Sequence, residues 1–132
     1  MNGFQLAVKA FIVDDGDVLA VRRAADDVQE PGIWELPGGR LSPGEEPRAG
    51  LQREVEEETG LDVELHEPLT VRHFDRDDGQ TVTMIVFRCG AGDRDVVLSE
   101  EHEEERWVLL DDAEATLNEF FHREVRAYRD MS

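Results

Sequence analysis

Hydrophobic and polar residues alternate in short runs along the first part of this chain, which is typical of strands joined by turns. Residues 4–13 are apolar and partly alternating, and residues 18–22 form a second apolar run. The polar stretch DDGD at residues 14–17 separates the two runs and is a turn signal. These segments therefore predict a β-hairpin. A polar loop over residues 24–32 then leads to a short strand over residues 33–36.

A helix is predicted after these strands, from about Glu46 to Thr59. Glu45 or Glu46 stands at its start, and the proline that follows is acceptable in a first helical turn. Gly60 is well placed as the C-cap, because glycine readily adopts the left-handed conformation that ends many helices.

The remaining residues predict three more strands and two more helices. The strands are expected over residues 63–74, 81–88 and 106–110, with a hairpin turn at residues 76–79 and loops over residues 90–95 and 99–105. A short helix starts near Ala113 with Asp111 or Asp112 as its cap, and a final helix spans residues 118–128. No repeat or linker interrupts this pattern. We therefore expect one α/β domain over residues 1–132, with a mixed β-sheet between helices.

A formal net charge of −18, from 32 acidic and 14 basic residues, limits the partners of the protein. Binding to nucleic acid needs a positive surface, so no nucleic-acid partner is expected. No apolar stretch approaches the roughly 20 residues of a membrane helix. The N-terminal segment MNGFQLAVKAFIV also lacks the features of a signal peptide. We therefore expect a cytoplasmic protein with no membrane partner.

Lys9 is the only lysine among the 14 basic residues. Together with the acidic excess, this bias favours a halophilic protein, adapted to a cytoplasm of high salt in which ionic screening shortens the range of self-repulsion. The alternative is an ordinary acidic protein from a GC-rich genome.

Four carboxylates lie within the five consecutive positions from Glu54 to Glu58. On a helix, Glu54, Glu57 and Glu58 fall at i, i+3 and i+4, so they share one face. Like charges at this spacing repel unless something cationic lies between them. Three hard oxygen ligands on one rigid face suit Mg²⁺ or Mn²⁺, and such an ion commonly bridges to substrate phosphates. The pattern predicts a metal-dependent phosphate enzyme.

The run from Gly39 to Leu61, GRLSPGEEPRAGLQREVEEETGL, matches every fixed position of the Nudix box, G-x5-E-x7-R-E-U-x-E-E-x-G-U with U aliphatic. The chain thus resembles the Nudix hydrolases, which cleave nucleoside diphosphates linked to another moiety. The resemblance implies the Nudix α/β/α sandwich with a mixed β-sheet. It also implies that the metal ligands include the carbonyl of Gly39 and the carboxylates of Glu57 and Glu58, with Glu54 as a further candidate ligand.

Three residues of the box have further expected roles. Glu54 is either a further metal ligand or the base toward the attacking water, and the sequence leaves both roles open. Arg53 can hold the carboxylate of Glu54 in place through a directional hydrogen bond. Glu45 is expected to be structural.

Outside the box the chain resembles the MutT-type enzymes, which hydrolyse oxidised purine nucleoside triphosphates. Residues 5–8 and 22–26 look like the first two strands of those proteins, and residues 34–39 fit their approach to the box. The resemblance implies that Arg23 contacts substrate phosphate and that Asn118 reads the purine edge, for which an amide offers both donor and acceptor. The alternatives are an exposed strand-end arginine and a simple helix N-cap.

The acidic loop at residues 99–105 offers one more candidate ligand. Glu101 lies six residues before Trp107, where relatives carry an extra acidic residue near the metal, and Glu104 is the competing candidate. His102 is a candidate base, but the pattern favours a solvated loop histidine.

These features lead to one hypothesis and two alternatives. The leading hypothesis is Mg²⁺-dependent hydrolysis of a nucleoside triphosphate to monophosphate and pyrophosphate, with an oxidised purine such as 8-oxo-dGTP as the candidate substrate. The alternative enzyme acts on ADP-ribose or another nucleoside-diphosphate-X compound. A non-catalytic nucleotide-sensing module is the alternative of another class, and the intact glutamate set argues against it. In each case the partner is a small-molecule nucleotide.

Overall fold

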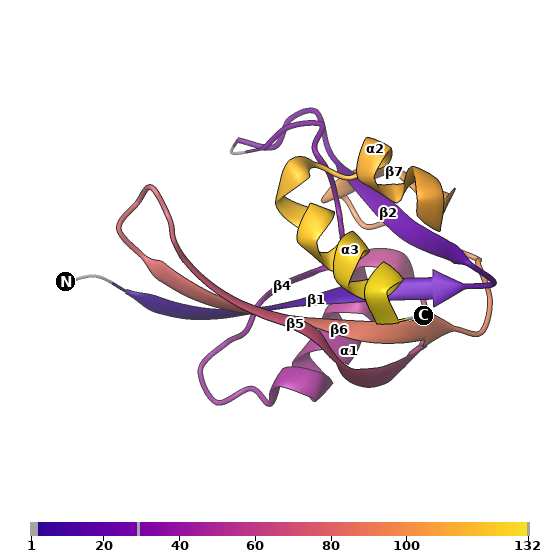
Figure 1. Ribbon diagram of the computed structural model, residues 1–132. Helices are drawn as coiled ribbons and strands as arrows, with labels where there is room; N and C mark the ends of the chain where they lie inside the picture. Colours follow the sequence, from indigo (N-terminus) through magenta and orange to yellow (C-terminus); the bar gives the residue numbers. More distant parts are fainter. Residues whose placement is uncertain (1–2, 29, 132) are drawn as a thin grey trace.

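The computed structural model describes residues 3–28 and 30–131, and its centre is a mixed β-sheet (Figure 1). Within these residues the sheet has seven strands in the order β3-β2-β1-β6-β5, while β4 pairs with β1 and β7 pairs with β2. The strands are β1 (Phe4–Asp14), β2 (Asp17–Arg23), β3 (Trp34–Glu35), β4 (Gly38–Arg40), β5 (Val63–Asp75), β6 (Thr81–Ala91) and β7 (His102–Leu109). The mixed sheet expected from the sequence is confirmed.

The strands pair in both directions. β1 and β6 run parallel from the Phe4–Thr81 pair to the Val13–Gly90 pair, and the other pairs are antiparallel. β1 and β2 form the predicted hairpin, in which Val13 lies opposite Val18. β5 and β6 form a second, longer hairpin, and together with β1 they extend beyond the helices in Figure 1.

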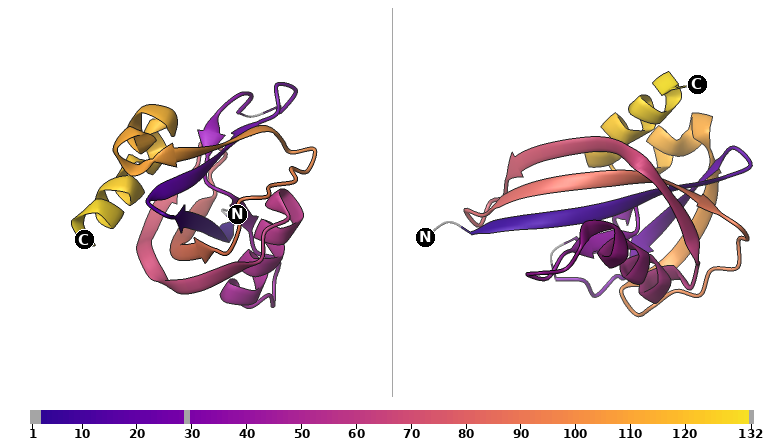
Figure 2. Two further views of the ribbon diagram at one scale, coloured as in Figure 1. Left: turned by 90° about the vertical axis from the view of Figure 1, so that its right-hand side faces the viewer. Right: turned by 90° about the horizontal axis from the view of Figure 1, so that it is seen from below.

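Helices cover both faces of this sheet (Figures 1 and 2). α1 (Pro47–Thr59) packs on one face, and α2 (Ala113–Thr116) and α3 (His122–Met131) lie on the other. The 3-10 turns η1 (Leu110–Asp112) and η2 (Glu119–Phe121) flank α2. The predicted α/β/α sandwich is therefore confirmed. In the described part of the chain, none of these helices combines the length and the apolar character that a membrane crossing requires.

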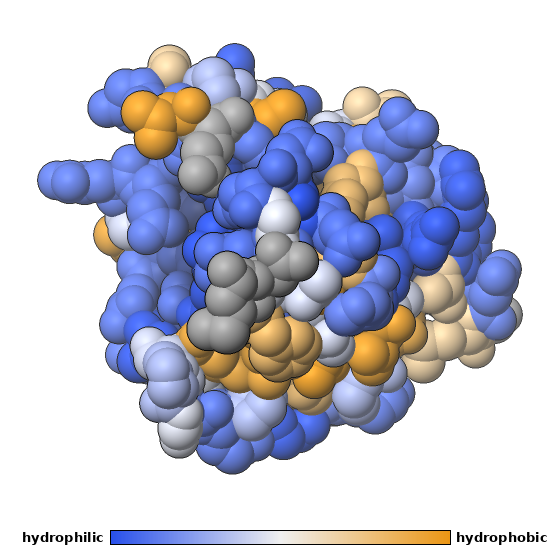
Figure 3. Space-filling view, turned by 90° about the vertical axis from the view of Figure 1, so that its left-hand side faces the viewer, coloured by the Kyte–Doolittle hydropathy of each residue, from blue (hydrophilic) through white to orange (hydrophobic). Residues whose placement is uncertain are grey.

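Two apolar clusters form the core, one on each face of the sheet. β1 contributes to both, because successive side chains of a strand point to opposite faces. Val8 and Ile12 belong to the cluster that includes Val55 of α1, whereas Phe11 belongs to the cluster that includes Val125 of α3. Outside the core, the face of the molecule shown in Figure 3 is mostly hydrophilic, with a band of apolar residues across it.

Several elements differ from the sequence prediction. β6 continues to Ala91, into the loop predicted over residues 90–95. The acidic loop ends early: β7 begins at His102 instead of residue 106, because its backbone already pairs with β2 there. β4 adds a strand over Gly38–Arg40 that the sequence pattern does not predict. The last helix begins at His122 instead of Asn118, since η2 precedes it.

Gly38 sets how the box approaches the sheet. Its φ is +136°, and a Cβ at this position would overlap the carbonyl oxygen of Val8. The position therefore accepts only glycine. The close approach lets β4 pair with β1, with Gly39 opposite Val8 and Gly38 opposite Lys9.

Candidate active site

The box helix α1 is fixed at both ends by its own sequence. Glu46 is the N-cap, and its carboxylate accepts hydrogen bonds from the N–H groups of Arg48 (3.1 Å) and Ala49 (2.8 Å). Gly60 ends the helix with a left-handed φ of 74°, and its N–H donates to the carbonyl of Glu56. The predicted start and the predicted C-cap are both confirmed. The two caps set where α1 begins and ends.

Arg53 is the cation that lies between the carboxylates of the box. Its Nε donates to Glu45 Oε2 at 2.9 Å, its Nη1 to Glu57 Oε2 at 3.0 Å and its Nη2 to Glu54 Oε1 at 3.4 Å. The hydrogen bond from Arg53 lowers the pKa of the Glu45 carboxyl below its ordinary value. One guanidinium therefore offsets the repulsion along this helix and orients two of the three predicted ligands.

Glu54 and Glu58 point from α1 toward β4. The N–H of Gly38 donates to Glu58 Oε1 at 3.4 Å, and a Cβ on Gly39 would lie 3.4 Å from Glu54 Oε2. Glu57, in contrast, leaves 59% of its side chain exposed and pairs with Arg53. The three glutamates thus share the predicted face of α1, but Glu58 is buried at its inner side and Glu57 is exposed at its outer side.

Glu58 is a buried carboxyl in an unfavourable environment. Its residue is only 2% exposed, and Oε2 has no hydrogen-bond partner within the described residues. Burial raises the pKa of Glu58 to about 9, and the neighbouring carboxylates of Glu54 and Glu101 add to this effect although Lys9 opposes it. A carboxyl held in this way gains greatly from a nearby positive charge.

Lys9, Glu35 and His102 form a buried polar chain beside Glu58. Lys9 Nζ lies 3.2 Å from Glu35 Oε1 and donates to the carbonyl of Leu36 at 3.1 Å. His102 Nε2 lies 2.9 Å from Glu35 Oε2, and His102 Nδ1 lies 3.8 Å from Glu58 Oε1. Burial opposes ionisation of Glu35, but Lys9 and His102 outweigh it and lower its pKa to about 2.

The expectation of a solvated loop histidine is wrong for His102. The residue is 5% exposed, because it opens β7 and lies opposite Arg23 of β2. The register of the two strands shifts there: Arg22 pairs with Glu104 and Arg23 with His102, so Glu103 is the extra residue of a bulge.

The segment before β7 is tied to the end of the box helix. The N–H groups of Val97 and Ser99 donate to the carbonyls of Thr59 and Glu58 at 2.8 and 3.2 Å, and Ala24 N–H donates to the Glu101 carbonyl at 3.0 Å. These bonds bring the Glu101 carboxylate to the site. Ligand atoms of Glu58, Glu101 and His102 all lie within 4.8 Å of one another.

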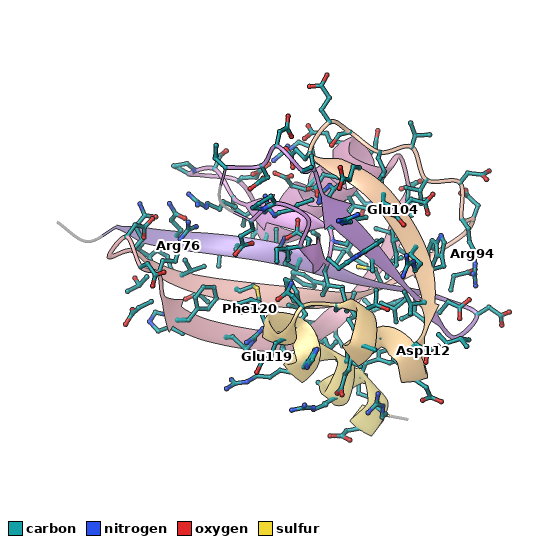
Figure 4. All side chains as sticks on the ribbon, turned by 90° about the horizontal axis from the view of Figure 1, so that it is seen from above. Arg76, Arg94, Glu104, Asp112, Glu119 and Phe120 are labelled. Carbon is teal, nitrogen blue, oxygen red and sulfur yellow. The ribbon has the colours of Figure 1, made fainter. Side chains whose placement is uncertain are left out.

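Glu104, the competing candidate, lies elsewhere. It pairs with Arg22 at 3.7 Å and with Arg106 at 3.3 Å, beside β2 and β7 (Figure 4), and it is not part of the ligand cluster of Glu58, Glu101 and His102. The geometry therefore favours Glu101 as the fourth acidic residue of the site.

A model of the NUDIX domain matches residues 3–128 of the chain. The chain belongs to the NUDIX family.

A MutT-like protein of Streptomyces ambofaciens is 35% identical over 108 residues; the match covers 82% of this chain and 65% of that protein, about two thirds of its length. The nucleoside triphosphatase NudI of Escherichia coli is 34% identical, with 76% of this chain and 79% of that protein covered. The crystal structure of a MutT protein from Methanosarcina mazei Go1 has a TM-score of 0.87 and 32% identity, and covers 99% of this chain and 97% of that one. The fold and the intact box identify the chain as a Nudix hydrolase.

The Nudix site fits a divalent cation. Its donors are hard oxygens, and a buried carboxylate oxygen of Glu58 has no hydrogen-bond partner in the described structure. Of the predicted ligands, Glu58 and Glu101 have ligand atoms within 4.8 Å of each other and Glu54 lies beside Gly39, whereas Glu57 and the carbonyl of Gly39 remain predicted ligands.

The two predicted substrate contacts of this Nudix hydrolase lie on either side of β3. Arg23 Nε is 3.1 Å from Glu35 Oε2, and Arg23 Nη1 donates to Asp27 at 2.9 Å. Asn118 donates from Nδ2 to the carbonyl of Trp34 at 2.7 Å, and its Oδ1 accepts from an N–H of η2 at 3.0 Å. Asn118 thus caps η2. These two hydrogen bonds use one N–H and one lone pair of the Asn118 amide, and one N–H and one lone pair remain for a ligand.

Lys9 and Glu35 are the site residues that sequence reasoning missed. A signal for both was present. Lys9 falls at an inward position in the alternating pattern of β1, and Glu35 stands within the short apolar strand between Trp34 and Leu36. Charged residues are almost never fully buried without a partner, so two such positions of opposite charge indicate a buried pair.

Proposed function

We propose that the protein hydrolyses nucleoside triphosphates to monophosphate and pyrophosphate in the presence of Mg²⁺. The observation that carries the proposal is the position of Glu58. A buried carboxyl group with an unpartnered oxygen lies beside Glu54, the backbone of Gly38 and the Glu101 segment, in a chain whose box from Gly39 to Leu61 is complete. A divalent cation would relieve the repulsion among these carboxylates, and a cation at this position would meet the phosphates of a nucleotide.

A bound divalent ion would neutralise phosphate oxygens and acidify a water molecule. The residues of the chain supply the remaining functions. Arg53 orients Glu54 and Glu57 by hydrogen bonds at 3.4 and 3.0 Å. Glu54 is either a ligand or the group that takes the proton of the attacking water. The water oxygen bonds to phosphorus, the anhydride bond to the leaving pyrophosphate breaks, and the electron pair stays on the pyrophosphate oxygen.

For the substrate we propose a purine nucleotide, with 8-oxo-dGTP as the candidate. The MutT-like and nucleoside triphosphatase relatives support a triphosphate. Arg23 is assigned to phosphate and Asn118 to the base. The support for Asn118 is its remaining amide N–H and lone pair, and the support for Arg23 is its position at the end of β2 beside the site.

The proposed setting is a cytoplasm of high salt. The supporting observations are the net charge of −18 and the single lysine, which is buried. Because the substrate is itself an anion, a divalent cation and a few local arginines must overcome the field of the protein.

A panel of nucleotides tests the proposal. Nucleoside triphosphates, including 8-oxo-dGTP, are compared with ADP-ribose and sugar nucleotides, with and without Mg²⁺, and pyrophosphate is measured separately from phosphate. The proposal expects Mg²⁺-dependent release of pyrophosphate with a preference for a purine triphosphate. A preference for ADP-ribose over every triphosphate would replace it with the nucleoside-diphosphate-X alternative, and binding without hydrolysis would favour the sensing module.

A further inference from the structure

Two polar atoms without hydrogen-bond partners belong to buried side chains that face each other in the site, where His102 Nδ1 lies 3.8 Å from Oε1 of Glu58. They are Nδ1 of His102 and Oε2 of Glu58, and neither is satisfied within the described residues. The side chains are 2% and 3% exposed, so water does not readily replace the missing partner. Buried polar groups are otherwise nearly always paired. The arrangement therefore calls for a ligand that both atoms can share.

The imidazole of His102 is held in one orientation from its far side. Nε2 lies 2.9 Å from Glu35 Oε2, and because an ionised carboxylate can only accept, Nε2 carries a proton. Glu35 is itself fixed by Lys9 at 3.2 Å and by Arg23 at 3.1 Å. Nδ1 is thereby directed at Glu58 and remains available as a donor of its lone pair.

The third group that faces this space is Glu101. One ligand atom from each of Glu58, Glu101 and His102 lies within 4.8 Å of the others. Glu101 is fixed through its carbonyl, which accepts from Ala24 N–H, and His102 through the pairing of β7 with β2. Backbone bonds therefore hold two of the three groups, and the box helix α1 holds the third.

We propose that His102 Nδ1, Glu58 and Glu101 bind a divalent transition metal, and that this mixed nitrogen and oxygen site prefers Mn²⁺ to Mg²⁺. The inference rests on the proposed function and adds to it the identity of one cation. Imidazole suits transition metals, whereas Mg²⁺ favours oxygen ligands alone. A metal-binding histidine commonly donates its other N–H to a carboxylate, which is the contact that His102 makes with Glu35. The competing explanation is a protonated His102 that pairs with both carboxylates and binds no metal.

Pulsed electron paramagnetic resonance of the Mn²⁺-loaded wild-type protein tests this site directly. The proposal expects a ¹⁴N coupling from a directly bound imidazole. It also expects the coupling to disappear in His102→Gln, with a loss of about 10- to 100-fold in Mn²⁺ affinity, while Mg²⁺ affinity changes far less. His73→Gln, at an exposed histidine of β5, is the matched control and should retain both the coupling and the affinity.

The wild-type spectrum needs no variant, so a folding defect in His102→Gln cannot hide the result. Glu35→Gln gives a second variant in which the histidine stays but loses its anionic acceptor, and it should weaken Mn²⁺ binding. Absence of nitrogen coupling in the wild type, or an unchanged coupling in His102→Gln, would overturn the proposal. Mg²⁺-dependent hydrolysis without nitrogen coupling would remove this metal site and leave the proposed function intact. Nitrogen coupling without hydrolysis of any nucleotide would support this metal site and overturn the proposed function.

Discussion

The Nζ atom of Lys9 lies 3.2 Å from Oε1 of Glu35 in the interior of the protein. Lys9 is the only lysine of the chain, and its side chain and that of Glu35 are 11% and 6% exposed. A buried ion pair contributes little net stability, but removal of one partner leaves an uncompensated charge. Here Glu35 also contacts His102 Nε2, and the opposite ring nitrogen of His102 faces the carboxylate of Glu58. The position of the Lys9–Glu35 pair therefore affects the orientation of His102 toward Glu58.

Glu35→Gln should change how stability depends on pH. The pKa of Glu35 is lowered from 4.5 to about 2, so the ionised form stabilises the fold above pH 4.5, and this contribution is lost as the pH falls toward 2. A depression of that size corresponds to about 3 kcal/mol. Urea unfolding should show that the free energies of unfolding of wild type and variant differ by an amount of that order at pH 7, and that the difference narrows below pH 4.5.

Glu105→Gln, at an exposed position of β7, controls for the general loss of one carboxylate. A gap between wild type and Glu35→Gln that stays constant from pH 7 to pH 3 would contradict the assignment of an ionised, buried Glu35.

Local signals explain why so much of the fold could be predicted. The caps Glu46 and Gly60 stand next to the helix that they end, and the turn between β1 and β2 is encoded by its own four residues. The box fixes its glutamates relative to one another by helical spacing alone. These features depend on neighbours in sequence, which a single chain displays directly.

The buried chain of Lys9, Glu35 and His102 could not be predicted in the same way. Its hydrogen bonds join residues 26 and 67 positions apart, and they exist only once β1, β3 and β7 enter one sheet. His102 lies in a run of glutamates that suggests an exposed loop, and only the pairing of β7 with β2 and the bulge at Glu103 show that its side chain turns inward.

Asn118→Ala separates two roles of this residue. Loss of the cap on η2 and of the bond to Trp34 should lower the free energy of unfolding by about 1 kcal/mol. If Asn118 also reads the base, preference among purine triphosphates should fall by about 5- to 150-fold, with little change for a poor substrate. Specificity constants for several nucleotides and a urea unfolding curve measure both effects. Equal changes for all nucleotides would show that Asn118 is a cap alone.

Arg23→Ala should lower the specificity constants of all nucleoside triphosphates by the same factor, because a phosphate contact does not depend on the base. Arg22→Ala is the matched control, since Arg22 pairs with Glu103 and Glu104 at the surface. Specificity constants across the same panel provide the measurement. An Arg23→Ala effect confined to one base, or equal to that of Arg22→Ala, would refute a phosphate contact.

The acidic surface predicts a strong dependence of stability on salt. With 32 acidic and 14 basic residues, self-repulsion should fall as the Debye length shortens to about 3 Å at 1 M salt. The thermal midpoint should rise markedly between low and molar KCl. A flat or falling midpoint would refute the halophilic interpretation and leave the enzyme assignment unchanged.

The central claim, that the box glutamates hold the cation that drives hydrolysis, is tested most directly by Mg²⁺-dependent pyrophosphate release from Glu57→Gln. Glu57 is exposed and nearly isosteric with glutamine, so the fold should persist. Loss of its charge should reduce turnover by at least about 10²-fold. Glu56→Gln, at the adjacent exposed position of α1, should retain wild-type turnover. Near wild-type Mg²⁺-dependent hydrolysis by Glu57→Gln would contradict the account.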